Sequence, residues 1–267
     1  MSRIRLDAEL VRRGLADTRS SARRLIAEGR VRVGGVVSPK PATMVAAGTP
    51  VELIGDGARF VSRGGEKLSH ALSEFSIDVS GQRAIDLGAS TGGFTDCLLQ
   101  LGAVEVTAVD VGYNQLDYRL RTDSRVIVYE RTNVRTADPG DLGGPFPVIV
   151  GDLSFISLEL VMPTVASLAA DHADIVLLVK PQFEVGKGQV SRGGVVTDPA
   201  LWAQAIDRVV TAAGSQGLGA RGLLASPLRG ASAGNVEFLL WLWRGPADMP
   251  DTALEEALVD IPEGSGP

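Results

Sequence analysis

The chain has 267 residues, of which 45% are hydrophobic and 22% charged, a composition typical of soluble globular proteins with one large domain or one medium and one small domain. Its longest apolar runs, residues 175–179 and 238–243, are far shorter than the ~20 residues of a membrane span, and the charged N-terminus does not resemble a secretory signal. A single cysteine, Cys97, and two histidines exclude a disulfide framework and a metal cluster, and predict a cytoplasmic protein without a metal.

The net charge of −6 is unevenly distributed along the chain. Residues 1–40 contain ten basic and four acidic side chains, so this segment carries +6 and the rest of the chain carries −12. A basic head on an acidic body predicts a polyanion-binding module that is attached to a second domain.

The N-terminal module spans residues 1–58 and is predicted to be small and mixed α+β. One helix is predicted over residues 6–13, and a second one, which Asp17 or Thr18 caps, ends at Glu28. Two short valine-rich runs flank a Gly-Gly turn within residues 31–37, which predicts a hairpin.

Arginines gather on the second of these helices. Arg19 and Arg23 are one turn apart and share a face, and Arg24 lies beside them. On charge alone, a solvated basic face explains this pattern as well as a binding surface does.

The pattern Leu6-Asp-x-x-Leu-Val-x-Arg-Gly-Leu15, followed by Ser-Arg and by Gly-x-Val-x-Val-x-Gly, resembles the S-four-type RNA-binding domain. This domain occurs in a ribosomal small-subunit protein, in pseudouridine synthases and in tyrosyl-tRNA synthetases. The chain departs mildly from the family, because it has Thr18-Arg-Ser-Ser21 where the family often has Ser-Arg. The resemblance implies that five arginines meet structured RNA through phosphates and shape. These are Arg5, Arg19, Arg23, Arg24 and Arg30.

Residues 59–62 are predicted to link the module to a body of residues 63–244, and residues 245–267 form a C-terminal tail that fits no pattern. In the body, apolar runs alternate with helical patterns. Seven strands with intervening helices predict a doubly wound, Rossmann-like α/β sheet, in which ligands bind at the carboxyl ends of the strands. The predicted strands are residues 84–87, 104–110, 126–129, 148–153, 175–180, 222–225 and 236–243.

The most informative stretch is Asp86-Leu-Gly-Ala-Ser-Thr-Gly-Gly-Phe94, where a buried strand turns through glycines into a helix. A dinucleotide fingerprint reads G-x-G-x-x-G, whereas here the glycines are Gly88, Gly92 and Gly93, and the acid Asp86 precedes them. Small residues let a ligand approach the backbone and a carboxylate attracts a cation, which fits the sulfonium and ammonium groups of S-adenosylmethionine. A strand-to-helix turn that binds no ligand is the alternative.

Polar side chains also follow the next three strands. Asp110 can accept hydrogen bonds from the ribose hydroxyls of either NAD or S-adenosylmethionine. Asn133 can accept from an adenine amino group, or it can belong to an ordinary turn. Asp152-Leu-Ser-Phe155 lacks the prolines of the Asn/Asp-Pro-Pro-aromatic pattern found in enzymes that methylate exocyclic amines, which predicts a different acceptor.

Three charged residues stand where a charge needs an explanation. Lys180 closes an apolar strand, where partial burial disfavours the ammonium form and suits a base. Glu237 is the one acid that enters another apolar strand, where a buried carboxylate needs a partner, and a structural salt bridge is the alternative. Lys67 stands at a helix start, which is usually a surface position.

Lys67, Asp152, Lys180 and Glu237 each occupy an element start or a strand end on what is predicted to be one face. This Lys-Asp-Lys-Glu set resembles the tetrad of ribose 2′-O-methyltransferases. A ribose hydroxyl is a poor nucleophile near neutral pH, so Lys180 would serve as the base while Asp152 and Glu237 fix the geometry of the ammonium groups. Alignment of oxygen, methyl and sulfur supplies much of the acceleration, and no metal is required.

Residues 3–243 as a whole resemble the TlyA family, bacterial proteins that were first called hemolysins. The most specific segments are Val61-Ser-Arg-Gly-Gly-x-Lys-Leu68, the glycine turn, Asp152-Leu-Ser-Phe-Ile-Ser157, Lys180-Pro-Gln-Phe-Glu-Val-Gly-Lys-Gly188 and Gly234-Asn-Val-Glu237. The resemblance implies S-adenosylmethionine-dependent 2′-O-methylation of cytidines in 16S and 23S ribosomal RNA, with a link to capreomycin and viomycin susceptibility. It also implies that the cofactor site is lined by Asp86, Gly88, Ser90, Gly92, Asp110, Asn133, Asp152 and Phe155.

The loop of residues 186–194 carries Lys187 and Arg192 between glycines, and we hypothesise that it closes over RNA, with a solvated linker as the alternative. Two rival functions compete with the enzyme. A pore-forming hemolysin needs amphipathic or membrane-spanning segments, which the sequence lacks, and a non-catalytic RNA-binding assembly factor would not need an intact tetrad. The protein is expected to act as a monomer on ribosomal RNA or ribosomal subunits.

Overall fold

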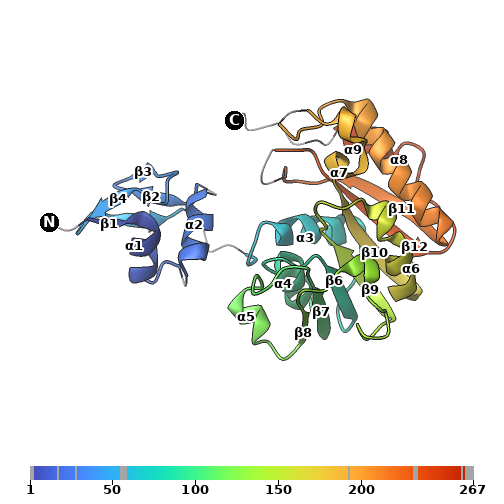
Figure 1. Cartoon of the computed structure of the whole chain (residues 1–267), viewed down its shortest axis with the longest axis horizontal. Coiled ribbons are helices and arrows are strands. Elements are labelled where there is room, and N and C mark those ends of the chain that lie inside the picture. Colours follow the sequence, from blue (N-terminus) through green and yellow to red (C-terminus); the bar gives the residue numbers. More distant parts are fainter. Residues whose placement is uncertain are drawn as a thin grey trace. The chain divides into compact units, whose positions relative to one another are not determined.

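The computed structural model describes residues 3–16, 18–27, 29–54, 59–191, 193–230, 234–259 and 261. The chain divides into two compact units, Met1–Arg59 and Phe60–Pro267. Figure 1 shows the course of the chain through both units and the labels of the elements.

The first unit packs two helices on short antiparallel strands. Helix α1 (Leu6–Arg12) and helix α2 (Arg19–Ala27) confirm the two predicted helices, and the predicted hairpin is β2 (Val31–Val33) with β3 (Val36–Val37). Three further strands were not predicted: β1 (Arg3–Arg5), β4 (Met44–Ala46), which pairs with β1, and β5 (Val51–Leu53), which pairs with β2. The core of the unit is made of Leu6, Leu10, Ala16, Ala22, Ile26, Val31, Val45 and Val51.

The second unit contains a seven-stranded sheet, as predicted, in the order β11-β12-β10-β9-β6-β7-β8. The neighbours from β10 to β8 are parallel, and β12 runs antiparallel to both β10 and β11. The strands are β6 (Arg83–Leu87), β7 (Glu105–Val109), β8 (Val126–Tyr129), β9 (Phe146–Gly151), β10 (Ala169–Val179), β11 (Leu218–Ala225) and β12 (Phe238–Arg244).

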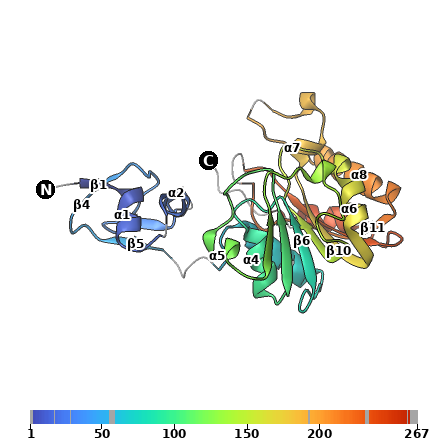
Figure 2. The same cartoon turned by 60° about the horizontal axis from the view of Figure 1, so that its bottom comes forward.

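Helices cover both faces of this sheet. Successive side chains of its central strands point to opposite faces, and the side chains on both faces are apolar. Along β10, Ile175 and Leu177 belong to the core beneath α6 (Met162–Leu168) and α8 (Pro199–Ser215), whereas Val176 and Leu178 belong to the core beneath α3 (Gly64–Glu74) and α4 (Gly93–Gln100). Figure 2 shows the strands between these two layers of helices. The carboxyl ends of the parallel strands therefore share one open edge, where the site lies.

The remaining elements of the second unit are short. They are α5 (Tyr118–Arg121), η1 (Val134–Thr136), η2 (Leu158–Leu160), α7 (Pro181–Glu184), η3 (Lys187–Gln189) and α9 (Ala253–Val259). None of the helices in the described part of the chain has both the length and the apolar character that crossing a bilayer requires.

Two described segments of the second unit, residues 60–61 and α9, are more firmly packed than the sequence suggested. Phe60 and Val61, which fall in the predicted linker, are each only 2% exposed, because the Phe60 ring packs against Gly65, which has no side chain. No element was predicted after Gly245, yet α9 buries Ala253 and Ala257 in the main core. Short alanine side chains give little apolar signal in the sequence, which is why this helix was missed.

Candidate active site

The glycine turn connects β6 to α4, and protein atoms occupy the space beside its glycines. Gly88 and Gly92 have φ of +86° and +95°, values that favour glycine. A Cβ on Gly88 would lie 2.9 Å from the carbonyl oxygen of Asp152, and one on Gly92 would lie 2.2 Å from a methyl group of Leu120. The small residues therefore let two protein segments approach the turn, whereas the sequence-based interpretation assigned that space to a ligand.

Asp86 is the residue before the last one of β6, and its side chain is completely buried. Its Oδ2 accepts hydrogen bonds from the amide nitrogen of Thr95 at 2.9 Å and from the Thr95 hydroxyl at 2.7 Å. Its Oδ1 is also buried and has no hydrogen-bond partner within the described residues. Burial raises the pKa of Asp86 to about 7, and the nearby charge of Asp152 adds to this effect. Such a carboxylate can accept a hydrogen bond from a positively charged donor.

A pocket lies at the ends of β6, β7 and β8, and its lining includes Ala89, Ser90 and Asp110. The Asp110 carboxylate is fixed there, because Oδ2 accepts from the Ser90 amide at 2.8 Å and Oδ1 accepts from the Gly112 amide at 2.6 Å. Gln115 also lines the pocket and accepts a 3.4 Å hydrogen bond from the Ser90 hydroxyl. The sequence reasoning missed Gln115, since it lies in a loop without a motif.

Asn133 stands at the start of η1 and acts there as a cap. Its Oδ1 accepts a hydrogen bond of 3.0 Å from the amide of Arg135, and its side chain is exposed. The turn role that the sequence left open is therefore present. The adenine contact stays a prediction, in which the side-chain oxygen would accept a second hydrogen bond.

Lys180 follows β10 directly, and its side chain is 7% exposed at the open edge of the sheet. Its Nζ lies 2.5 Å from Oδ1 of Asp152 and donates a 2.7 Å hydrogen bond to the hydroxyl of Ser154. Asp152 and Ser154 both belong to the segment that follows β9. Ser154 was not singled out in the sequence, because a serine three residues after a strand carries no specific signal.

Lys67 and Glu237 form a second buried ion pair, in which Nζ of Lys67 donates to Oε2 of Glu237. The two ion pairs are neighbours on the sheet. Val179 and Phe238 are register partners on the antiparallel strands β10 and β12, so Lys180, which follows Val179, and Glu237, which precedes Phe238, leave the two strands at the same end. All four predicted tetrad residues thus lie at the same sheet edge, as two ion pairs.

Phe155 follows this cluster and is held in an unusual conformation. Its φ is +65°, which a bulky side chain seldom adopts, and 91% of its surface is exposed. The ring centroid lies 5.3 Å from that of Phe183, with the ring planes tilted by 49°. An exposed aromatic ring on a strained backbone next to the tetrad is a surface on which a flat ring can stack.

The loop of residues 186–194 has one firmly held end. Asn235, which is 3% exposed, accepts from the amide of Val196 at 2.9 Å and donates to the carbonyl of Gly194 at 2.8 Å. Lys187 begins η3, but its side chain lies outside the described residues, and so does Arg192. The predicted closing motion of this loop therefore stays a hypothesis.

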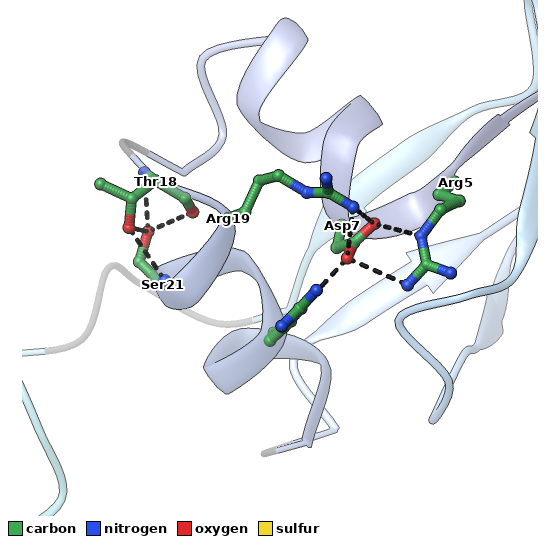
Figure 3. A network of polar contacts seen from close by, with 6 residues as sticks. Arg5, Asp7, Thr18, Arg19 and Ser21 are labelled. Carbon is green, nitrogen blue, oxygen red and sulfur yellow. Dashed lines mark hydrogen bonds and ion pairs between the residues drawn. The ribbon is translucent and has the colours of Figure 1, made fainter.

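In the first unit, three of the five predicted RNA-binding arginines converge. Arg5, Arg19 and Arg23 all contact the carboxylate of Asp7 (Figure 3). Arg24 on α2 is partly buried, and Nε of Arg30 lies 3.5 Å from the carbonyl oxygen of Ile54. Within the residues that the structure describes, no group of three or more His, Cys, Asp or Glu side chains could hold a metal ion.

Comparison with protein families finds two matches, one in each unit. Residues 60–244 match the family model described as FtsJ-like methyltransferase, and residues 4–51 match the S4 domain. The first match covers the whole sheet and both ion pairs. The second covers both helices of the first unit and all of its strands, except the first residue of β1 and the last two residues of β5.

Individual relatives cover nearly the whole chain. The chain is 54% identical over 241 residues to the 16S/23S rRNA (cytidine-2′-O)-methyltransferase TlyA of Mycobacterium tuberculosis, and the match covers 90% of each protein. It is 38% identical to hemolysin A of Brachyspira hyodysenteriae, covering 88% of this chain and 98% of the relative. A solved structure of a hemolysin-named protein from Streptococcus thermophilus has a TM-score of 0.77 and 40% identity, and the match covers 97% of this chain and 96% of that one.

Proposed function

Because the chain belongs to the TlyA family of FtsJ-like methyltransferases, we propose that it transfers a methyl group from S-adenosylmethionine to the ribose 2′-hydroxyl of cytidines in 16S and 23S ribosomal RNA. The observation that carries the proposal is the pair of buried ion pairs at the sheet edge, Lys67 with Glu237 and Lys180 with Asp152. Two amines and two carboxylates at one edge supply the groups that deprotonation of a hydroxyl requires.

The residues around the glycine turn fit S-adenosylmethionine. The unpartnered, buried Oδ1 of Asp86 can accept from the ammonium of the cofactor, and the fixed carboxylate of Asp110 can accept from its ribose hydroxyls. Ser90 and Gly88 shape the same turn, and Asn133 would meet the adenine. When bound, the cofactor supplies an electrophilic methyl group on a positively charged sulfur.

Lys180 is the residue to which we assign the proton transfer. In its neutral form the amine can take the proton of the 2′-hydroxyl as the oxygen attacks, and the resulting ammonium is then held by Asp152 and Ser154 in the arrangement that the structure has. The Lys67–Glu237 pair keeps a positive charge beside the attacking oxygen, where negative charge develops. Asp152 also supplies the carbonyl oxygen against which Gly88 packs, so it links the turn to the amine.

The first unit is proposed to recruit the RNA through its arginine side chains, which contact phosphates and shape rather than bases. Such a substrate places the enzyme in the cytoplasm. All four tetrad residues come from one chain, so a monomer has a complete site. No metal is assigned a role in this mechanism.

The proposal is tested by labelled methyl transfer to separated small and large ribosomal subunits, followed by mapping of ribose-methyl stops in the RNA. The parent protein should label cytidines, and Lys180→Ala should label them at least about 100-fold more slowly while it still binds S-adenosylmethionine. Equal transfer by the two proteins would discard the assignment. The hemolysin names of two relatives are tested separately by dye release from liposomes, which the purified protein should not cause.

A further inference from the structure

We propose that Asp7 is the positioning residue of the RNA-binding surface on the first unit. Its carboxylate holds Arg5, Arg19 and Arg23 in one fixed array that receives neighbouring phosphates of the RNA backbone. This inference rests on the proposed function, because it takes RNA as the ligand of the first unit. It adds a role for an acid on a surface that is otherwise defined by its bases.

The contacts of Asp7 use both of its carboxylate oxygens (Figure 3). Arg5 binds it in a bidentate manner, with Nε 3.1 Å from Oδ1 and Nη2 3.2 Å from Oδ2. Nη2 of Arg19 lies 3.2 Å from Oδ1 and 3.1 Å from Oδ2, and Nε of Arg23 lies 3.2 Å from Oδ2. Three guanidinium groups from β1 and α2 are thus oriented by one carboxylate on α1.

Burial divides this cluster into a hidden centre and an open rim. The side chain of Asp7 is 0% exposed, whereas those of Arg5, Arg19 and Arg23 are 43%, 53% and 57% exposed. The arginines themselves cover the acid. One negative charge cannot neutralise three positive charges, so the surface that faces solvent is cationic although its centre is an acid.

The arginines keep donors for a second acceptor. Each guanidinium has five N–H groups in a planar fork. Toward Asp7, Arg19 uses only Nη2 and Arg23 uses only Nε, so both Nη1 groups are left for a phosphate. A guanidinium whose orientation is already fixed loses less conformational entropy when it binds a phosphate than a free one does.

The local sequence places the arginines for this purpose. The amide of Thr18 donates to the hydroxyl of Ser21 at 3.0 Å, and the amide of Ser21 donates to the hydroxyl of Thr18 at 3.1 Å, which fixes the start of α2. Arg19 is the first residue of this helix and Arg23 follows one turn later on the same face. A cation in the first turn opposes the helix dipole, so its place there needs a reason, and Asp7 supplies the compensating charge.

An attraction of RNA to the net charge of the surface alone is the competing explanation, and the two explanations predict opposite signs for the effect of removing the charge of Asp7. Asp7→Asn raises the net charge of the surface by one unit. If only charge mattered, RNA would bind more tightly to this variant. If Asp7 positions the arginines, RNA binds more weakly in spite of the added positive charge.

The experiment measures binding of the full chain to transcribed 16S ribosomal RNA by fluorescence anisotropy over a series of salt concentrations. Asp7→Asn should weaken binding by about 5- to 20-fold. The matched control is Glu9→Gln, which releases Arg12 and Arg13 from the second arginine-bound acid of the same helix and should bind RNA as tightly as the parent or more tightly. Equal or tighter binding by Asp7→Asn, with the far-ultraviolet circular dichroism of the parent, would overturn the proposal.

A second pair of variants decides the matter if Asp7→Asn does not fold. Arg23→Lys keeps the charge at a side chain that is 57% exposed but loses the planar fork, and it should weaken binding by about 5-fold. Arg12→Lys makes the same change at a 58% exposed arginine bound to Glu9 and should leave binding unchanged. Equal binding by both lysine variants would refute a positioned array. Methyl transfer by the parent protein tests the proposed function independently of these binding results.

Discussion

Lys67 and Glu237 form a buried ion pair although 170 residues separate them in the chain. Only 8% of Lys67 and 4% of Glu237 is exposed, so bulk water stabilises neither charge. Glu237 directly precedes Phe238, the register partner of Val179, and Lys180 directly follows Val179. One carboxylate therefore contacts one amine of the site and neighbours the other, which ties α3 to the reactive edge of the sheet.

Replacing both residues of this pair should restore the stability that single substitutions remove, but not the methyl transfer. Lys67→Met and Glu237→Leu should each lower the free energy of unfolding by about 3–5 kcal/mol, because each leaves an unpaired buried charge. The double variant should regain most of this loss, since two apolar side chains can pack together. Urea denaturation measures the first effect. Methyl transfer should be absent in all three variants, and recovery of transfer by the double variant would mean that the pair is only structural.

The sequence predicted the seven strands and the charged residues of the candidate site, because the signals of both are local. An apolar run that ends in Asp86, Lys180 or Asp152 is visible without any knowledge of the fold. Which amine pairs with which carboxylate was not predictable, since this depends on the strand order, which places β9, β10 and β12 side by side. The strands of the first unit are only two or three residues long, too short for a periodicity signal, so three of them were missed.

The same distinction explains two contacts that the sequence did not reveal. The sequence indicated correctly that the glycines of the turn make room for a neighbouring group. It could not show that Leu120 and Asp152 are among the neighbours that occupy this space. Asp7 was read as part of a motif and not as the centre of an arginine cluster, because its partners lie 2, 12 and 16 positions away. Long-range contacts of this kind appear only in the folded chain.

Binding of S-adenosylmethionine should release a proton near neutral pH. Burial raises the pKa of Asp86 to about 7, so at pH 6 most free protein carries this carboxyl in its neutral form. A bound ammonium favours the charged carboxylate and lowers its pKa. Affinity should therefore increase between pH 5 and pH 7, a range in which the α-ammonium of the cofactor, with a pKa of about 8, stays protonated. Titration calorimetry in two buffers with different ionisation enthalpies measures the released proton directly.

Asp86→Asn is the control for this coupling. The variant has no titratable group at position 86, so its weaker binding should no longer change between pH 5 and pH 7, and the heat should no longer depend on the buffer in that range. Buffer-independent binding by the parent protein would show that the cofactor ammonium does not reach Asp86.

Two helical glycines should respond to alanine with opposite signs. A Cβ on Gly93, the first residue of α4, would lie 2.1 Å from the Ser62 hydroxyl and 2.9 Å from the amide nitrogen of Gly65, so Gly93→Ala should lower the free energy of unfolding by about 1–3 kcal/mol. A Cβ on Gly214 in α8 would meet nothing within 4 Å, and Gly214→Ala should raise that free energy by about 0.5–1 kcal/mol. Thermal unfolding monitored by circular dichroism compares the two. A loss of stability in Gly214→Ala would contradict the open space described there.

Acid should unfold the first unit through Asp7 and Glu9, which are both bound by arginines. Hydrogen bonds from Arg5, Arg23 and Arg19 hold the pKa of Asp7 well below its ordinary value, and those from Arg12 and Arg13 lower the pKa of Glu9 to about 2. A carboxylate with a lowered pKa in the folded state contributes stability above its unfolded pKa, about 4 for both residue types. This contribution is lost as the pH falls from about 4 toward 2, when the acids take up protons and release the arginines.

The three tryptophans, at positions 202, 241 and 243, all lie in the second unit, so two optical signals can separate the units. Far-ultraviolet circular dichroism reports on both units and tryptophan fluorescence reports on the second. In the parent protein, part of the dichroism signal should be lost between pH 4 and pH 2. Asp7→Asn lacks one of the two titrating acids, so its first unit should start from a lower stability at pH 6 and lose less of it over the same range. Urea titrations of the dichroism signal at pH 4 and pH 2 measure this stability, and an equal loss in both proteins would mean that Asp7 does not carry its charge in the folded state.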